Sequence, residues 1–105
     1  MMIDETIALN RLFDYYGSLL TKRQQEVFEY YYHEDYSYQE IADLLNITRA
    51  AAYDNLKRAK ESLYNYEEKL RFSKRLDDLI KSLQDLKDKE VNQLIEKFYN
   101  GGKYD

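Results

Sequence analysis

The sequence contains no cysteine, no proline and only three glycines. Without cysteine the chain can form neither a disulfide nor a thiolate zinc site, and it is compatible with a reducing cytoplasm. Without proline, and with two of the glycines at positions 101 and 102, few positions interrupt a helix. The composition therefore predicts an all-α fold. A chain of 105 residues is enough for one domain, or for a small domain with an extension.

The chain is also poor in residues that do chemistry. His33 is the single histidine, and it is followed directly by Glu34 and Asp35, which does not match the spacing of a helical zinc-binding motif. No glycine-rich phosphate loop is present, and Ser37 and Thr48 lack a second histidine that could activate a hydroxyl. We therefore expect no enzymatic activity, no catalytic residue, no metal site and no cofactor.

No apolar run approaches the roughly 20 residues that span a bilayer. The first ten residues, MMIDETIALN, carry acids where a secretion signal would carry bases. We expect a soluble, cytoplasmic protein that does not insert into a membrane.

The most informative stretch is SYQEIADLLNITRAAAYDNLKRA, residues 37–59. Ser37 and Glu40 have the spacing of a capping box, which predicts a helix that begins at Tyr38. Its apolar face would comprise Ile41, Ala42, Leu44 and Leu45, and Ala42 is small enough for a second helix to approach closely.

A tight turn is predicted directly after this helix. Asn46 tolerates the left-handed conformation that ends a helix, Ile47 is apolar beneath the corner, and Thr48 can cap a second helix that begins at Arg49. Together these offsets favour the helix-turn-helix geometry of DNA readers. The plain alternative is an ordinary pair of packed helices, many of which contain a capped turn and a polar face.

The second helix has two distinct faces. Its apolar stripe, predicted to be buried, is Ala52, Leu56, Ala59, Leu63, Tyr66 and Leu70. The face predicted to read DNA in the major groove is Arg49, Ala50, Tyr53, Asp54, Lys57 and Arg58. Further phosphate contacts are expected from Ser37, Tyr38, Gln39, Thr48 and Lys60.

Charge is unevenly distributed along the acidic chain, whose net charge is -4. Residues 1–48 carry -6, residues 49–75 carry +4 and residues 76–105 carry -2. The net-positive segment thus begins at the predicted reader helix, as phosphate binding requires. A solvated helix of mixed charge would give a similar count, because Asp54 and Glu61 interrupt the bases.

Two helices are predicted before this stretch and one or two amphipathic helices after it. The first covers residues 4–20, and the second follows a capping box at Thr21 and Gln24 and ends near residue 32. The reader helix has no stop signal until about residue 70, which makes it unusually long. The core domain is thus expected at 1–72 and a helical extension at 73–105, with Ser73 as a cap and a disordered tail at 100–105.

The apolar stripes of this extension leave two alternatives open. They could fold back on the N-terminal helices or pair with a second copy of the chain, because both arrangements require the same apolar period. A homodimer would suit a DNA reader that binds two half-sites.

Three consecutive tyrosines, Tyr30, Tyr31 and Tyr32, cannot all lie on one face of a helix. Tyrosines beside bases can stack on nucleic acid, but acidic residues surround this run. We expect them to pack in and around the core, with each hydroxyl bonded to water or to a partner.

Residues 12–70 resemble the YlxM-type proteins, a bacterial family of small helix-turn-helix proteins. The segments that carry the resemblance are LFDYYGSLLTKRQ, EYYYHEDYSYQEIADLLNITRAAAYDNLKRAKE and YEEKL. The resemblance implies a fold like region 4 of bacterial sigma factors, with Arg49, Ala50, Tyr53, Asp54 and Lys57 on the recognition surface. It also implies a link to the signal recognition particle, since family members are typically encoded beside its protein component or receptor. Position 52 departs from the pattern, because alanine stands where a larger residue such as valine is expected.

Three hypotheses for function follow from these observations. The first is a non-enzymatic regulatory protein that binds double-stranded DNA as a homodimer, in the setting of protein targeting. The second keeps the fold but makes the surface a protein adaptor for the signal recognition particle or RNA polymerase. The third is a binder of the particle RNA, whose narrow major groove admits a helix less readily.

Overall fold

A computed structural model describes the backbone of residues 3–104 and the side chains of residues 5–100. The elements of this described part are helices, which confirms the predicted all-α fold. They are α1 (Ile3–Tyr16), the short 3-10 helix η1 (Gly17–Leu19), α2 (Lys22–Tyr32), α3 (Tyr38–Leu45), α4 (Arg49–Leu70), α5 (Phe72–Gln84) and α6 (Lys89–Tyr104). The chain divides into two compact units, residues 1–71 and residues 72–105.

Two capping boxes set where α2 and α3 begin. The Thr21 hydroxyl accepts from the Gln24 amide at 3.1 Å, and the Gln24 side chain accepts from the Thr21 amide at 3.1 Å. Ser37 and Glu40 repeat the same pair of bonds before α3. Each box satisfies two backbone amides that a helix start leaves unpaired, so both predicted starts are confirmed.

The end of α4 near residue 70 is as predicted, but the start of the following helix is not. Arg71 has a φ of 51° and donates its backbone amide to the Glu67 carbonyl at 2.7 Å, which closes α4 one residue beyond Leu70. Helical geometry resumes at once at Phe72, so Ser73 lies inside the first turn of α5 and is buried. The prediction that Ser73 precedes the helix as its cap was therefore wrong.

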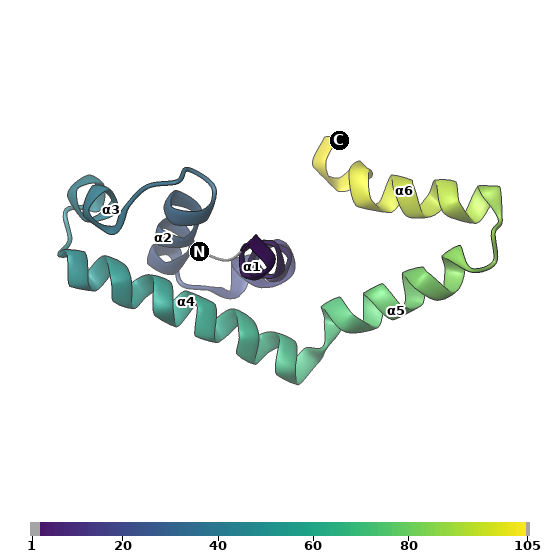
Figure 1. The fold of residues 1–105 in the computed structure, drawn as a ribbon, viewed down its shortest axis with the longest axis horizontal. Coiled ribbons are helices and arrows are strands. Elements are labelled where there is room, and N and C mark those ends of the chain that lie inside the picture. The colour runs from purple at the N-terminus through teal and green to yellow at the C-terminus, as the bar shows by residue number, and fades with distance from the viewer. Residues whose placement is uncertain (1–2, 105) are drawn as a thin grey trace. The chain divides into compact units, whose positions relative to one another are not determined.

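The core of the N-terminal unit lies between α4 and the three helices before it. Figure 1 shows α1, α2 and α3 along one side of α4, with α3 at its N-terminal end. Buried side chains from all four helices meet there, together with Leu20 from the turn before α2: Leu9, Leu12, Tyr16, Leu20, Val27, Phe28, Ile41, Ala42, Ala52, Leu56, Ala59 and Leu63. Phe13 stacks on Phe28 with ring centroids 4.4 Å apart, so aromatic contacts help to join α1 to α2.

Two residues predicted to lie on apolar faces are largely exposed. Leu70 is 52% exposed because it occupies the last turn of α4, beyond the buried stripe. Leu44 is 53% exposed on α3, whose buried side chains are Ile41 and Ala42. A helix as short as α3 covers a narrow strip of the core, so the flanks of its apolar face meet solvent.

The second half of α4 holds α1 and η1, which explains its length. The Tyr16 hydroxyl donates to the Glu67 carboxylate at 2.7 Å. The Tyr66 hydroxyl donates to the Leu19 carbonyl at 3.4 Å. The first half of α4 therefore packs against α3, and its second half binds α1 and η1.

The C-terminal unit is a pair of amphipathic helices. Asp88 caps α6 by accepting from the amides of Glu90 and Val91 at 2.9 and 3.1 Å. Several large apolar side chains of α5 and α6 are exposed: Phe72, Leu79, Leu94, Phe98 and Tyr99. The tail was predicted to be disordered from residue 100, and α6 runs to Tyr104, the last residue whose backbone is described. Asp105 lies outside the described residues.

Leu56 tests the importance of the buried stripe of α4. It is 1% exposed, and we expect Leu56→Ala to lower the free energy of unfolding by about 2–5 kcal/mol because it leaves a cavity. The matched control is Leu44→Ala, the same substitution at an exposed position, for which we expect a loss below about 1 kcal/mol. Urea denaturation followed by circular dichroism measures both, and equal losses would contradict the assignment of the core.

Candidate nucleic-acid interface

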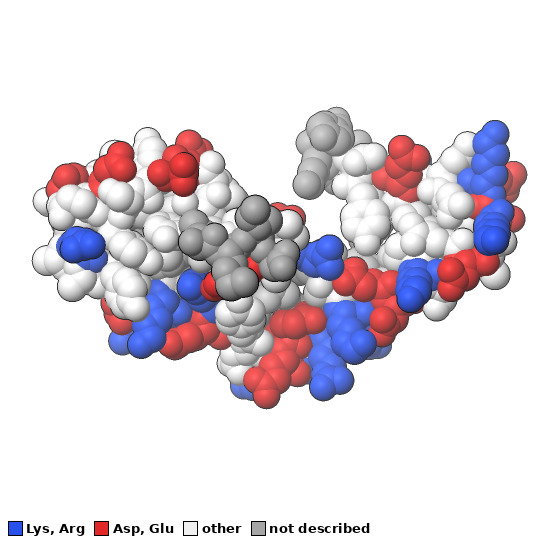
Figure 2. Space-filling model, viewed as in Figure 1, with Lys and Arg blue, Asp and Glu red and all other residues white. Residues whose placement is uncertain are grey.

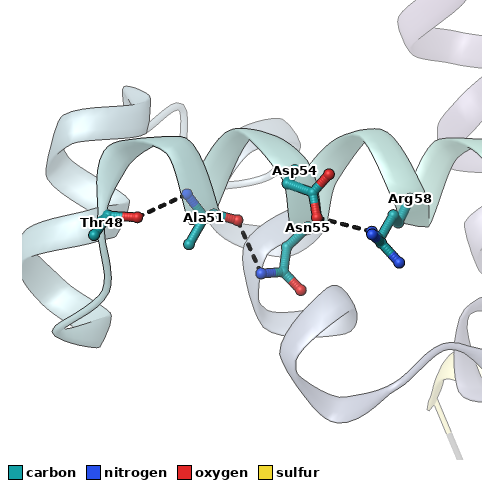
Figure 3. Close-up of polar contacts among 5 residues, drawn as sticks. All are labelled: Thr48, Ala51, Asp54, Asn55 and Arg58. Atoms are coloured by element: carbon teal, nitrogen blue, oxygen red, sulfur yellow. Dashed lines mark hydrogen bonds and ion pairs between the residues drawn. The ribbon is translucent and has the colours of Figure 1, made fainter.

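The turn between α3 and α4 has the geometry of a helix-turn-helix corner. Asn46 adopts the left-handed conformation with a φ of 56°, and the Ile47 amide donates to the Ala42 carbonyl at 3.0 Å. The Thr48 hydroxyl accepts from the Ala51 amide at 3.0 Å and so caps α4 (Figure 3). These contacts fix the angle at which α4 leaves the corner.

Small side chains allow the two helices to approach at this corner. Ala42 and Ala52 are 1% and 0% exposed, and α3 packs against α4. Alanine at position 52, where the family resemblance suggested a larger residue, is therefore fully enclosed.

The six residues predicted to read DNA are all exposed on the first half of α4: Arg49, Ala50, Tyr53, Asp54, Lys57 and Arg58. They face away from the buried stripe of Ala52, Leu56 and Ala59. We refer to these six residues as the α4 face. Its position on an exposed helix that follows the corner is the one a recognition helix occupies.

The start of α3 lies beside the start of the α4 face. Ser37, Tyr38 and Gln39 line one surface hollow together with Arg49 and with Tyr31 of α2. Because Ser37 caps the Glu40 amide, the amides of Tyr38 and Gln39 are the ones that the helix start offers to a ligand. Three predicted phosphate contacts and one predicted base contact thus share a single hollow.

Lys60 lies apart from this group. Its ammonium is 3.3 Å from the Glu5 carboxylate of α1. Burial lowers the pKa of Lys60, but the neighbouring Tyr32 hydroxyl and Glu5 outweigh this effect, so the pKa is raised overall. Lys60 was predicted to contact phosphate, whereas in the structure it joins α4 to α1.

An ion pair lies within the α4 face. The Arg58 guanidinium donates to the Asp54 carboxylate at 2.8 Å, and Asn55 donates to the Ala51 carbonyl at 2.9 Å (Figure 3). The two charged side chains are 68% and 54% exposed, so the pair contributes little to stability. Asp54 partly neutralises Arg58. The other two bases of the face, Arg49 and Lys57, form no ion pair with a carboxylate of the described residues.

A cluster of three tyrosines supports the start of the α4 face, and the sequence did not predict it. The Tyr38 ring stacks on Tyr31 with centroids 5.0 Å apart and meets Tyr53 edge to face at 5.4 Å. The cluster escaped prediction because its members come from three different helices and follow no common period. The run at 30–32 does pack around the core, as predicted, with Tyr30 stacked on Tyr36.

Charges of both signs lie on the surface. Figure 2 shows Lys and Arg side chains alternating with Asp and Glu along α4, and acidic side chains above α2 and α3. Within the described residues no cluster of histidine and acids could hold a metal ion. None of the helices in that part of the chain has the length and hydropathy needed to cross a membrane.

The capped corner, the buried alanines and the exposed helix that follows define a helix-turn-helix protein. Comparison with known families agrees, because residues 3–100 match the family model described as "Putative helix-turn-helix protein, YlxM / p13 like". The chain belongs to this family, UPF0122.

Relatives in several bacteria share most of the chain. It is 44% identical over 100 residues to a UPF0122 protein of Oceanobacillus iheyensis, covering 91% of this chain and 95% of the relative. A UPF0122 protein of Caldanaerobacter subterraneus is 45% identical over 87 residues, which cover 83% of this chain and 74% of the relative. A UPF0122 protein of Desulforamulus reducens is 48% identical over 93 residues, which cover 89% and 75%. The similarity therefore extends beyond the helix-turn-helix segment.

The tyrosine cluster makes stability depend on pH in the alkaline range. Burial is the largest cause that raises the pKa of Tyr38 well above its usual value of 10.0, followed by a hydrogen bond with Tyr31. The unfolded chain therefore loses this proton first, so the stabilisation is complete below about pH 10 and is lost as the pH rises toward the folded-state pKa.

We expect Tyr38→Phe to make the fall in unfolding free energy above about pH 10 shallower, since phenylalanine has no proton to lose. Urea denaturation at several alkaline pH values measures the slope. Tyr64→Phe supplies the matched control, because Tyr64 is exposed on α4 and lies outside the cluster. Identical slopes for wild type and Tyr38→Phe would contradict the prediction.

Proposed function

We propose that this protein is a non-enzymatic regulator that binds double-stranded DNA through the α4 face and the start of α3. The observation that carries the proposal is the arrangement of α4, whose first half is buried along one side and exposes six side chains along the other. A helix held in this way at a helix-turn-helix corner can enter a major groove.

Each part of the surface has a chemical role in this proposal. Arg49 can donate two parallel hydrogen bonds to O6 and N7 of guanine, and Lys57 supplies a charge for a phosphate. The amides of Tyr38 and Gln39 at the start of α3 suit a second phosphate, because the helix dipole favours an anion there. The backbone contacts come from the start of α3 and the side-chain contacts come from α4. Together they would orient α4 along the groove.

We further propose that the protein acts in protein targeting with the signal recognition particle, as the family resemblance implies. A component of that particle is then a second partner. Fluorescence anisotropy against duplex DNA, the particle RNA and the particle protein, each at two salt concentrations, distinguishes the ligands. Binding to the RNA alone would favour the third hypothesis over DNA.

A protein adaptor is the second candidate function, and one observation favours it. The Asp54–Arg58 pair places a carboxylate in the middle of the α4 face, where it would repel a phosphate backbone and could pair with a base on a partner protein. The adaptor would be supported if the protein binds the particle protein with an affinity that added nucleic acid does not change.

We also propose that the protein works as a homodimer joined through its C-terminal unit. Exposed apolar side chains on α5 and α6, among them Leu79, Leu94 and Phe98, form the kind of surface that a second copy can cover. A two-fold dimer would present two α4 faces to successive half-sites.

The DNA proposal predicts the effect of reversing two charges. We expect the double variant Arg49→Glu, Lys57→Glu to abolish retardation of duplex DNA in a gel, because it replaces attraction for the phosphates by repulsion. The single variant Lys57→Ala should reduce the slope of log affinity against log salt concentration by about one, as for the loss of one phosphate contact.

The control for this experiment makes the same change in net charge at two residues outside the α4 face. Lys69 in the last turn of α4 and Lys81 in α5 are both exposed, and Lys69→Glu with Lys81→Glu should leave most of the retardation intact. Retardation that survives the change at Arg49 and Lys57 would contradict the proposed binding face.

The dimer proposal predicts the mass in solution. We expect sedimentation equilibrium to give twice the 12.7 kDa of the chain, and Leu94→Lys with Phe98→Lys to give the single mass. Circular dichroism would check that the double variant keeps its helices. A wild-type protein that stays monomeric at micromolar concentration would contradict the dimer.

A further inference from the structure

A second hollow on the α4 face has a chemistry that the proposed function leaves unused. It is lined by Tyr38, Arg49, Ala50 and Tyr53, and it adjoins the hollow at the start of α3, with which it shares Tyr38 and Arg49. The α3 hollow offers polar groups from Ser37 and Gln39, whereas the second hollow is walled mainly by two aromatic rings and a methyl group.

The walls of this hollow are held in place before any ligand arrives. The Tyr53 ring is fixed edge to face against Tyr38, and Tyr38 is in turn stacked on Tyr31. Tyr53 nevertheless remains 54% exposed, and Ala50 beside it is also exposed. An apolar surface that is braced by ring contacts and open to solvent, on an otherwise charged helix face, is suited to a small apolar group.

Resting on the proposed DNA binding, we infer that the second hollow accepts the 5-methyl group of a thymine in the major groove. That methyl is the apolar group in the pattern that base pairs present there, and alanine and aromatic side chains are suitable contacts for it. Arg49 on the rim supplies the positive charge that draws a nucleic acid to this position. The adjoining polar hollow with the α3 amides would hold a phosphate at the same time.

Uracil in DNA tests the inference, because it differs from thymine by this methyl group alone. The probe is a duplex selected by the wild-type protein from a pool with a random core of about 20 base pairs, long enough for two half-sites. It is resynthesised with uracil in place of each thymine in turn. We expect one position in a half-site at which uracil weakens binding about fourfold, the value for burying one methyl group.

Two variants link that effect to the hollow. Tyr53→Ala removes one wall, and Ala50→Gln fills the hollow with a polar side chain that suits a helix. In both, we expect the ratio of thymine to uracil affinity to fall from about four to about one. Tyr64→Ala is the matched control on the same helix and should keep the wild-type ratio. Circular dichroism checks that each variant is folded. If Tyr53→Ala does not fold, Ala50→Gln alone still tests whether the affinity ratio depends on the hollow.

The outcomes separate this inference from the function on which it rests. If the pool yields no bound duplex, the DNA proposal fails and the thymine site fails with it. If a duplex is bound but uracil is tolerated at every position, or if the uracil effect persists in both variants, the thymine site alone is wrong and DNA binding stands.

Discussion

The buried stripe of α4 is the constraint on which the N-terminal unit depends, because α1, α2 and α3 all pack against this helix. Ala52 and Ala59 alternate along it with Leu56 and Leu63, and all four are almost fully enclosed. Small residues let neighbouring helices approach, and the leucines fill the space between them. Since one side of the helix must stay dry, the opposite side is directed to solvent at a fixed angle. The α4 face is therefore a consequence of core packing, and what it binds is decided by the few side chains placed on it.

The side chains of the α4 face and its surroundings carry charges of both signs and are not strongly basic. Asp54 pairs with Arg58, and Lys60 is engaged by Glu5, so the positive charge available to phosphates comes chiefly from Arg49 and Lys57. A surface of this kind binds nucleic acid weakly unless base contacts or a second copy of the chain add to it. The proposed dimer and the aromatic hollow beside Arg49 are two ways in which a modest charge could still give a specific complex. They can be tested separately, because the proposed dimer surface belongs to the C-terminal unit and the hollow to the N-terminal unit.

Local signals in the sequence were sufficient for most of the fold. Capping boxes at Thr21 and Ser37 and the turn residue Asn46 correctly indicated the starts of α2 and α3 and the end of α3, because their effect depends only on neighbours a few residues away. Contacts between distant segments were harder to foresee. Nothing local indicates that Lys60 meets Glu5, that Tyr66 reaches the Leu19 carbonyl, or that Tyr31, Tyr38 and Tyr53 gather beside Arg49. The candidate site was therefore predictable as a set of exposed positions on one helix, but its hollows were not, since each is formed by side chains from more than one helix.

The most direct test of the central claim is to map the bound surface by NMR. Amide chemical shifts of the labelled full-length protein would be recorded while a duplex of random sequence, about 20 base pairs long and so longer than one helical turn, is added at low salt. If the α4 face and the start of α3 bind DNA, the largest shifts will fall in residues 37–39 and 48–58, and they will diminish as salt is raised. Shifts concentrated in α5 and α6, or the absence of any salt-dependent shift at the α4 face, would contradict the account.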